Sequence, residues 1–398
     1  MESVEFLVVG CGPAGGTAAR EAARRGIETL VLERDKVVGA KRVCAAGLRP
    51  GFCENFNLPR SIVHCDPPTI ALHSPTAERY EFTVGPAHTT TREELDGTIA
   101  DFARREGAQI RTHALYRMPV RDGDRVVVEY ADLVAGERRK VAARAVFLAQ
   151  GATARLEETS FDYADWRGGL ITCVQYRVYL DRPATAETYA TLEMHYYTSP
   201  CSGRPIIAWM FPKRDHLSVG LGIQAKVPGI ELRAELDAFV PGVLQRLAPS
   251  ASYTLKEEGS LLYGGAPRPR IADETAMVGG TAAGLVDATT GEGIHEAATS
   301  GRVAAEAIAT ARRAARFNPG ELYRRAITRA FYGRLHHRHK LMRFLERKPA
   351  RFDVLFTQLA GNPRFAELLQ HDRNDFTPMQ WAYLYRQAAA FSLRALRV

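Results

Sequence analysis

The strongest constraint on how this chain folds is a glycine turn that follows a short apolar strand near the N-terminus. Gly10, Gly12 and Gly15 have GxGxxG spacing and lie between apolar residues 6–9 and an alanine-rich helix over 17–25. In such a turn the first glycine permits a tight bend, the second lets the backbone approach a pyrophosphate, and the third lets the helix pack on the strand. The free N–H groups and the positive dipole end of the helix attract phosphate. This order of strand, turn and helix predicts a dinucleotide-binding unit.

A second apolar strand over 29–32 ends in Glu33, which is placed to accept a hydrogen bond from an adenosine ribose hydroxyl. NAD and FAD share this pattern, so this part of the sequence leaves the choice between the two dinucleotides open. The residues predicted to contact the dinucleotide here are Gly10, Gly12, Pro13, Ala14, Gly15, Glu33 and Arg34.

The composition is that of an ordinary soluble globular protein. The 398 residues suffice for two domains, and 46% of them are apolar and 25% charged. No apolar run is long enough for a transmembrane helix, and we expect no signal peptide because the first strand begins so near the N-terminus. The six cysteines are scattered without a CxxC pair, which predicts reduced thiols and a cytoplasmic protein.

The net charge of +8 is concentrated in 317–398, where 15 Lys and Arg outnumber 6 Asp and Glu. The sequence leaves two interpretations of this amphipathic region open: it makes peripheral contact with anionic lipid at the inner face of a membrane, or it is a solvated helical cap. No nucleic-acid-binding motif accompanies the charge, so no nucleic-acid partner is predicted. His336, His337 and His339 lack a partnering Cys or carboxylate pattern and are interpreted as surface residues, and no metal site is predicted.

A second glycine-rich segment decides the cofactor. The stretch TTGEGI, residues 289–294, precedes a long alanine-rich helix, which places the amides of Gly293 and Ile294 at a helix N-terminus. A reduced flavin carries negative charge near N1 and C2=O, and helix-end amides stabilise that charge. An NAD enzyme has no need of a second set of donors so far along the chain, so the prediction is FAD.

With these motifs the chain resembles the geranylgeranyl reductase family of flavoproteins, which share the fold of para-hydroxybenzoate hydroxylase. The resemblance covers roughly residues 4–310 and has four landmarks. They are the GxGxxG unit with Glu33, KRVCAAGL at 41–48, AWMFPKRDHLSVGLG at 208–222, and GGTAAGLVDATTGEGIHEAATSG at 279–301.

The resemblance and the strand pattern together predict the architecture. Alternating apolar and polar residues between 168 and 222 predict an antiparallel sheet with one buried face. The expected fold class is α/β, with a discontinuous Rossmann-like FAD-binding domain, an inserted antiparallel-sheet substrate domain and a helical C-terminal region. The expected bounds are 1–65, 89–155 and 268–316 for the FAD-binding domain, 66–88 and 156–267 for the substrate domain, and 317–398 for the helical region.

The resemblance also implies roles for single residues. The guanidinium of Arg92 would reach the FAD phosphates, and Cys44 would lie in a loop over the flavin, where it lines the cavity or donates a proton. His295, near the expected flavin ring, is the second candidate catalytic residue; the alternatives are a small buried hydrophobe at Cys44 and a plain helix-face residue at His295. Further cofactor contacts implied are Lys41, Cys44, Ala46, Gly47, Gly151, Gly280, Thr281, Gly291, Gly293 and Ile294.

An apolar wall for the substrate is implied at Ile207, Trp209, Phe211 and Pro212, where the family usually has Tyr-x-Trp-x-Phe-Pro. Such a wall would suit a prenyl chain. Ile207 stands at the position of the usual tyrosine.

The expected activity is therefore FAD-dependent reduction of carbon–carbon double bonds in a polyprenyl or similarly apolar small molecule. Hydride would leave N5 of reduced FAD, and the proton would come from solvent or from Cys44. The transient electron donor is expected to be NAD(P)H or a ferredoxin-type protein. Two alternatives stay open, an FAD-dependent monooxygenase of the same fold and a non-catalytic flavoprotein, and the sequence does not predict the oligomeric state.

Overall fold

A computed structural model describes residues 1–40, 44–83, 87–122, 125–154, 156, 159–199, 203, 205–224, 231–369 and 376–398. The chain forms two compact units, each assembled from three separate segments. The first unit comprises Met1–Arg42, Arg92–Leu170 and Leu261–His339. The second comprises Val43–Thr91, Ile171–Ser260 and Lys340–Val398.

The first unit is built on a sheet with strand order β7-β2-β1-β10-β9-β8, and β16 pairs with the C-terminal end of β10. Strands β7, β2, β1, β10 and β16 run parallel, whereas β8 and β9 are antiparallel additions. Residues 6–9 and 29–32 are buried throughout, as expected for parallel strands covered on both faces. The strands are β1 Glu2–Val9, β2 Thr29–Leu32, β7 Gln109–Arg111, β8 Ala114–Asp122, β9 Arg125–Asp132, β10 Glu137–Leu148 and β16 Ala276–Val278.

Helices α1 (Pro13–Ala23) and α6 (Ile294–Ala311) pack against each other in this unit. Their approach is so close that a β-carbon on Gly301 would lie 2.1 Å from the carbonyl oxygen of Ala14, so only glycine fits there. Helix α3 (Arg92–Arg105) packs on α1, and α7 (Pro319–Ile327), which continues into the π-helix Thr328–Tyr332, packs on α6.

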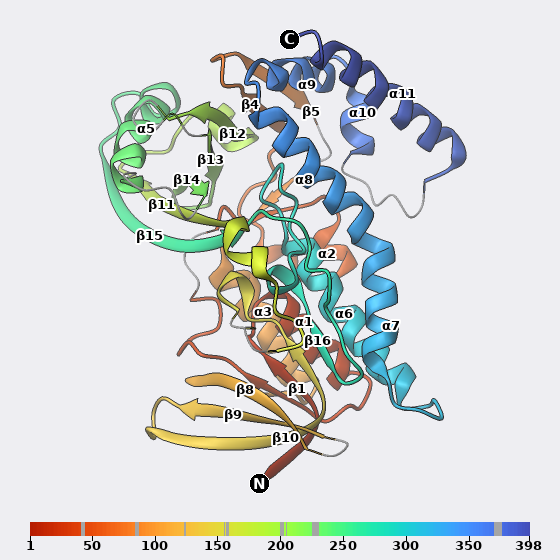
Figure 1. Cartoon of the computed structure of the whole chain (residues 1–398). Helices are drawn as coiled ribbons and strands as arrows, with labels where there is room; N and C mark the ends of the chain where they lie inside the picture. The colour runs from red at the N-terminus through yellow and green to blue at the C-terminus, as the bar shows by residue number, and fades with distance from the viewer. Residues whose placement is uncertain are drawn as a thin grey trace. The chain divides into compact units, whose positions relative to one another are not determined.

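The second unit is built on a sheet with strand order β15-β11-β14-β13-β12-β4-β5. Helix α5 (Leu232–Leu247) covers one face, where Ile206, Ala208 and Met210 of β13 are buried with it (Figure 1). The alternate residues of β13 face the opposite side. The strands are β4 Thr69–His73, β5 Arg79–Thr83, β11 Leu170–Leu180, β12 Thr191–Thr198, β13 Pro205–Pro212, β14 Leu217–Gln224 and β15 Tyr253–Tyr263.

Beyond residue 317 the described chain is helical, and α9, α10 and α11 pack against one another. Among the described residues no helix is both long and apolar enough to cross a membrane. The architecture confirms the α/β fold class predicted from the sequence. The remaining elements are α2 Phe52–Asn55, α4 Ala186–Ala190, α8 Gly333–Glu346, α9 Ala350–Ala360, α10 Pro363–Leu368, α11 Pro378–Ala395, the paired strands β3 Gly47–Leu48 and β6 His88–Thr89, and four 3₁₀ turns at Arg60–Ile62, Gly151–Thr153, Ala164–Gly169 and Gly280–Ala283.

Candidate functional site

The N-terminal glycine turn has the tight geometry that its spacing predicts. Gly10 adopts φ +92°, and its N–H donates to the carbonyl oxygen of Leu32 over 2.8 Å. A β-carbon on Gly15 would lie 1.8 Å from the carbonyl oxygen of Gly10, so any larger residue would force α1 away from β1. Pro13 is the first residue of α1, where its missing N–H costs nothing.

Gly12 caps the start of α1, and the guanidinium of Arg92 lies directly beside it. A β-carbon on Gly12 would lie 3.3 Å from Nη2 of Arg92. The guanidinium is held there by the buried carboxylate of Asp96, with an Nη2–Oδ2 distance of 2.6 Å. The structure therefore places a fixed positive charge at the helix start predicted to bind the pyrophosphate.

Glu33 stands at the end of β2 and connects it to the glycine turn. Its Oε2 accepts from the main-chain N–H of Cys11 over 2.7 Å, and its Oε1 accepts from that of Asp35 over 2.9 Å. Burial raises the pKa of the Glu33 carboxyl above its usual range, and these two hydrogen bonds oppose that rise. Arg34 is exposed and pairs with Asp35.

The second glycine-rich segment is organised by the buried carboxylate of Asp287. Its Oδ1 accepts from the N–H and the hydroxyl of Thr289, over 2.9 Å and 2.6 Å, and its Oδ2 lies 3.4 Å from Nε of Arg338 and 3.8 Å from Nη1 of Arg334. Burial alone would raise the pKa of Asp287, but the two arginines and Thr289 hold it below its usual range. Arg334 also pairs with the buried Glu296, so the start of α6 is fixed by ion pairs on both sides.

The two glycine segments come together within the first unit. Gly280, with φ +58°, lies between the side chains of Ala14 in α1 and Ala297 in α6, and a β-carbon there would meet both at 3.1–3.2 Å. Gly293 caps α6, so Ile294 and His295 are its first two residues. The other predicted contacts in this unit are Gly151 after β10, Thr281 in the 3₁₀ turn that follows β16, and Gly291 at φ +71°.

These residues fit the dinucleotide that the sequence predicts. A side chain at Gly12 would stand at the start of α1 against Arg92, so this glycine leaves the backbone donors uncovered, and Gly280 lets its segment pack closely on both helices. A guanidinium and two helix N-termini are donors that suit a pyrophosphate and an electron-rich ring.

In the second unit, Ile207, Trp209 and Phe211 lie on the sheet face opposite α5 and are half-buried. Pro212 is buried at the end of the strand, and its carbonyl oxygen accepts from the hydroxyl of Thr89 over 2.7 Å. Ile207, Trp209 and Phe211 therefore form a continuous apolar strip along one strand, whereas Pro212 has the alternate parity and belongs to the α5 side of the sheet. The role of the strip in binding a substrate stays a prediction.

Residues 44–48 pack on the end of this strip. A β-carbon on Gly47 would lie 2.7 Å from the Phe211 ring, so the absence of a side chain lets the segment approach the aromatic ring. Ala46 adopts φ +47°, and its carbonyl oxygen accepts from the N–H of Thr90. Its own N–H points at Sγ of Cys44 over 3.4 Å. Lys41, a predicted cofactor contact, lies outside the described residues.

Lys213, for which the sequence predicted no role, anchors the same segment. Its side chain is 1% exposed, and its Nζ donates to the carbonyl oxygen of Ala45 and lies 3.5 Å from that of Ala46. Burial lowers the pKa of Lys213 to about 7. The signal for this residue in the sequence was its position directly after the Phe-Pro pair, because a charged residue there ends the apolar strip.

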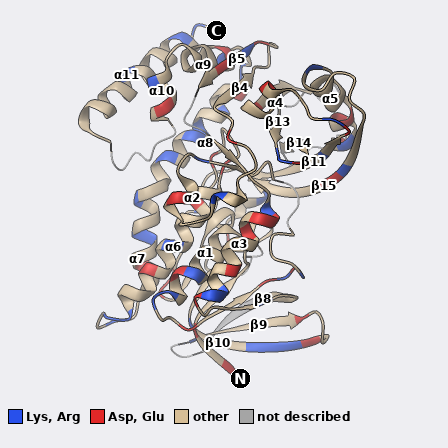
Figure 2. Ribbon diagram, turned by 180° about the vertical axis from the view of Figure 1, so that it is seen from behind, with Lys and Arg blue, Asp and Glu red and all other residues tan. Residues whose placement is uncertain are grey.

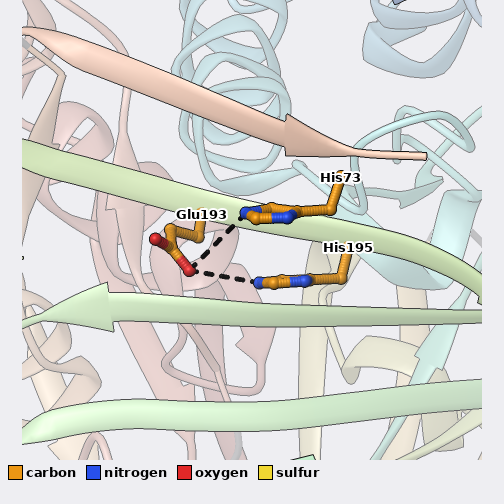
Figure 3. Close-up of side chains that lie close together, drawn as sticks. All are labelled: His73, Glu193 and His195. Atoms are coloured by element: carbon orange, nitrogen blue, oxygen red, sulfur yellow. Dashed lines mark hydrogen bonds and ion pairs between the residues drawn. The ribbon is translucent and has the colours of Figure 1, made fainter. Parts of the chain in front are cut away.

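A second group that the sequence did not predict lies on the α5 face of the sheet. His73 of β4 and His195 of β12 stack with ring centroids 3.9 Å apart and planes 9° apart, and both ring Nε2 atoms face Glu193 (Figure 3). The Nε2–Oε2 distances are 3.2 Å for His195 and 3.8 Å for His73. Arg246 of α5 binds both carboxylate oxygens of Glu193.

This group has the residue types of a metal site but not the geometry. An imidazole binds a metal ion through a lone pair in the plane of its ring. Because the two rings are stacked and parallel, one ion cannot lie in the planes of both. Glu193 is also already paired, because Arg246 and His195 together lower its pKa to about 2 despite its burial. Burial and the neighbouring His195 lower the pKa of His73 to about 3. The group is therefore a histidine stack beside a buried ion pair, and its His73 ring is held in the neutral form.

The chain is similar to named reductases and to solved flavoproteins. It is 30% identical over 325 residues to geranylgeranyl diphosphate reductase of Synechocystis. The matched region covers 77% of this chain and 75% of that protein. It is also 30% identical over 316 residues to digeranylgeranylglycerophospholipid reductase 1 of Methanopyrus kandleri, covering 76% and 79% of the two chains. No protein-family model matches the chain.

Two solved structures share the fold. A geranylgeranyl bacteriochlorophyll reductase-like protein of Thermoplasma acidophilum superposes with a TM-score of 0.74 at 21% identity, covering 100% of this chain and 98% of that one. A flavin-dependent brominase superposes with a TM-score of 0.74 at 17% identity, covering 98% and 100%. At these identities the likeness concerns the fold alone.

Proposed function

The chain belongs to the geranylgeranyl reductase family of FAD-dependent oxidoreductases, and from this premise we propose that it reduces carbon–carbon double bonds of a polyprenyl or similarly apolar substrate. The observation that carries the proposal is the pairing of two kinds of surface in one chain. The first unit has glycine-lined helix starts with a fixed arginine, and the second has an apolar, aromatic strip on one sheet face.

FAD would be held by the first unit. The start of α1 and Arg92 would bind the pyrophosphate, Glu33 the adenosine ribose, and the amides of Gly293 and Ile294 the electron-rich end of the ring. Bound FAD in its reduced form supplies the hydride that reduction of a double bond requires. The ion pairs of Asp287 and Glu296 with Arg334 keep the start of α6 in place, which keeps those donors preorganised.

The substrate would lie against the strip formed by Ile207, Trp209 and Phe211. An isolated double bond is unactivated, so the protein must contribute positioning and the exclusion of water rather than polar activation. A strip of large apolar side chains on a rigid sheet suits both tasks.

A proton must reach the second carbon of the reduced bond. Cys44 and His295 are the proposed donors among the predicted residues, with solvent as the third source. Lys213 anchors the turn that carries Cys44 and would thereby hold its thiol in place. Electrons would reach the cofactor from NAD(P)H or from a ferredoxin-type protein that binds transiently.

The purified protein tests this function directly. We expect a visible spectrum with flavin maxima, release of FAD on denaturation, and a copurifying lipid whose mass matches a partly reduced prenyl chain. A colourless protein that takes up no added FAD would contradict the proposal. Oxygen consumption coupled to substrate loss would instead support a monooxygenase.

Peripheral contact with anionic lipid is proposed through α11. The helix contains arginine but no acidic residue (Figure 2). Met379, Tyr385, Leu393 and Leu396 follow one face of the helical segment and are 65–78% exposed. Exposed apolar side chains flanked by arginine are typical of helices that lie in a membrane interface.

Sedimentation with vesicles tests this contact. We expect binding to vesicles that contain anionic lipid, and loss of binding when Tyr385 and Leu393 are both changed to Ser. Equal binding of the variant and the unaltered protein would contradict the assignment to α11.

A further inference from the structure

One row of residues runs across four strands of the second unit and explains how Trp209 is oriented. Met194 of β12 lies opposite Trp209 of β13, Trp209 opposite Gly220 of β14, and Gly220 opposite Gln175 of β11. Paired residues in neighbouring strands project to the same face of a sheet. The row therefore lies on the face opposite α5, with the apolar strip.

Gly220 lets the indole ring cross the row. A β-carbon on Gly220 would lie 2.5 Å from Cζ2 of Trp209, so the ring occupies the space that a side chain would fill. The indole thereby reaches Gln175 two strands away, and its Nε1–H donates to Oε1 of Gln175 over 2.9 Å.

Gln175 is itself fixed by a buried ion pair. Its Nε2 donates to Oε2 of Glu258 over 3.2 Å, and Oε1 of Glu258 lies 2.9 Å from Nε of Arg177. Gln175 and Glu258 are 1% and 3% exposed. The amide cannot turn over, because that would set its NH₂ group against the indole N–H and its oxygen against a carboxylate.

We propose that Gln175 is a positioning residue that holds the Trp209 indole at one angle, and that this angle sets which lengths of apolar chain the enzyme accepts. The inference rests on the proposed function, because it takes the Trp209 strip as the substrate wall. A tryptophan side chain has two rotatable bonds. The chain of contacts from Arg177 through Glu258 to Gln175, here called the relay, fixes both bonds through a single hydrogen bond to the indole. Discrimination between prenyl lengths in an apolar site depends on such fixed wall shape.

Tryptophan fluorescence of the holoenzyme tests the orientation without any substrate. The chain has three tryptophans, Trp166, Trp209 and Trp381, so the difference between the unaltered protein and Trp209→Phe isolates the emission of Trp209. In Gln175→Met the indole loses its acceptor. We expect the Trp209 emission to shift and its quenching by acrylamide to rise at least about twofold; an unchanged emission would overturn the inference.

A double variant separates orientation from general damage. Gln175→Glu combined with Glu258→Gln exchanges the amide and the carboxylate but keeps each hydrogen bond of the relay. We expect this exchange to restore the Trp209 emission. An emission that stays altered in the double variant would count against the relay. Gln175→Asn is the second variant should Gln175→Met fold poorly, because it keeps an amide that is too short to join Trp209 to Glu258.

Kinetics then test the effect on the substrate. With a geranylgeranyl compound we expect Gln175→Met to raise KM about tenfold while kcat changes less than about twofold, and to reduce the preference for this chain over a farnesyl chain. A purely structural loss would instead lower kcat by lowering the amount of active enzyme. If the unaltered enzyme reduces no prenyl compound, the proposed function fails, while the fluorescence result still decides whether Gln175 orients Trp209.

Discussion

Nη2 of Arg92 lies 3.3 Å from the point where a β-carbon on Gly12 would stand. The two residues stand at the starts of different helices, Arg92 as the first residue of α3 and Gly12 as the cap of α1, and together they place a guanidinium beside the free N–H groups of a helix start. Asp96 holds the guanidinium in this position in the described structure. The phosphate-binding proposal thus depends on a glycine that leaves space and on an arginine that is already oriented.

Alanine substitutions at two glycines of the turn are expected to have different consequences. Gly15→Ala would bring a methyl group to 1.8 Å from the carbonyl oxygen of Gly10, so α1 must shift and thermal stability must fall strongly. Gly12→Ala would meet only side-chain ends, Nη2 of Arg92 at 3.3 Å and Oδ2 of Asp96 at 3.9 Å, so the protein should fold normally but bind FAD more weakly. Thermal unfolding of the apoprotein and fluorescence titration with FAD measure the two effects, and the reverse pattern would contradict the assignment.

Removing the charge of Arg92 should weaken both folding and FAD binding, and a second substitution should separate the two. Arg92→Met takes the guanidinium away from the buried carboxylate of Asp96, which is expected to cost about 3 kcal/mol in the free energy of unfolding. The double variant Arg92→Met with Asp96→Asn should recover stability because the buried negative charge is removed together with the guanidinium. It should not recover FAD affinity; a double variant that binds FAD as tightly as the unaltered protein would exclude Arg92 as a phosphate ligand.

Lys213 should make stability depend on pH above neutrality. An unfolded lysine keeps its proton up to about pH 10.5, whereas the folded pKa of Lys213 is about 7. Between these values the unfolded state binds more protons, so the free energy of unfolding rises with pH, by up to about 1.4 kcal/mol per pH unit. Denaturant unfolding at pH 7 and pH 9 should show this rise relative to Lys213→Met, and parallel curves for the two proteins would contradict the buried, weakly basic amine.

Zinc should not bind at the histidine stack with the affinity of a preformed site. Calorimetric titration of the unaltered protein and of His73→Ala with His195→Ala should give the same zinc affinities, since any binding elsewhere is common to both. A tight site present only in the unaltered protein would show that one ring turns out of the stack and that Glu193 exchanges Arg246 for the ion.

The elements of this architecture that depend on neighbouring residues could be predicted from the sequence. The GxGxxG turn, the start of α6 and the alternating strands are encoded by neighbouring residues, and their elements are confirmed in the structure. Lys213 with Ala45, and Gln175 with Glu258, are contacts between residues far apart in the chain, and no spacing rule connects them. Gln175 also resembles a solvent-facing residue in an alternating strand, so its burial emerges only once Gly220 and the Trp209 ring are placed in the same row.

Glu193 illustrates the same limit for charged groups. A glutamate within an apolar strand gave no signal in the sequence, because its partner Arg246 lies in a helix 53 positions later. Only the sheet register brings His73, Glu193 and His195 together. The predicted roles of Cys44, His295 and the cofactor contacts stay predictions.

Hydride transfer from the flavin to a prenyl double bond can be measured in a single anaerobic turnover. The FAD-loaded protein is reduced chemically without oxygen, mixed with a geranylgeranyl compound, and followed by the flavin absorbance while the product is analysed by mass. We expect that the oxidised flavin spectrum returns and that the product gains two hydrogen atoms for each flavin reoxidised. A reduced flavin that no prenyl compound reoxidises would contradict this expectation.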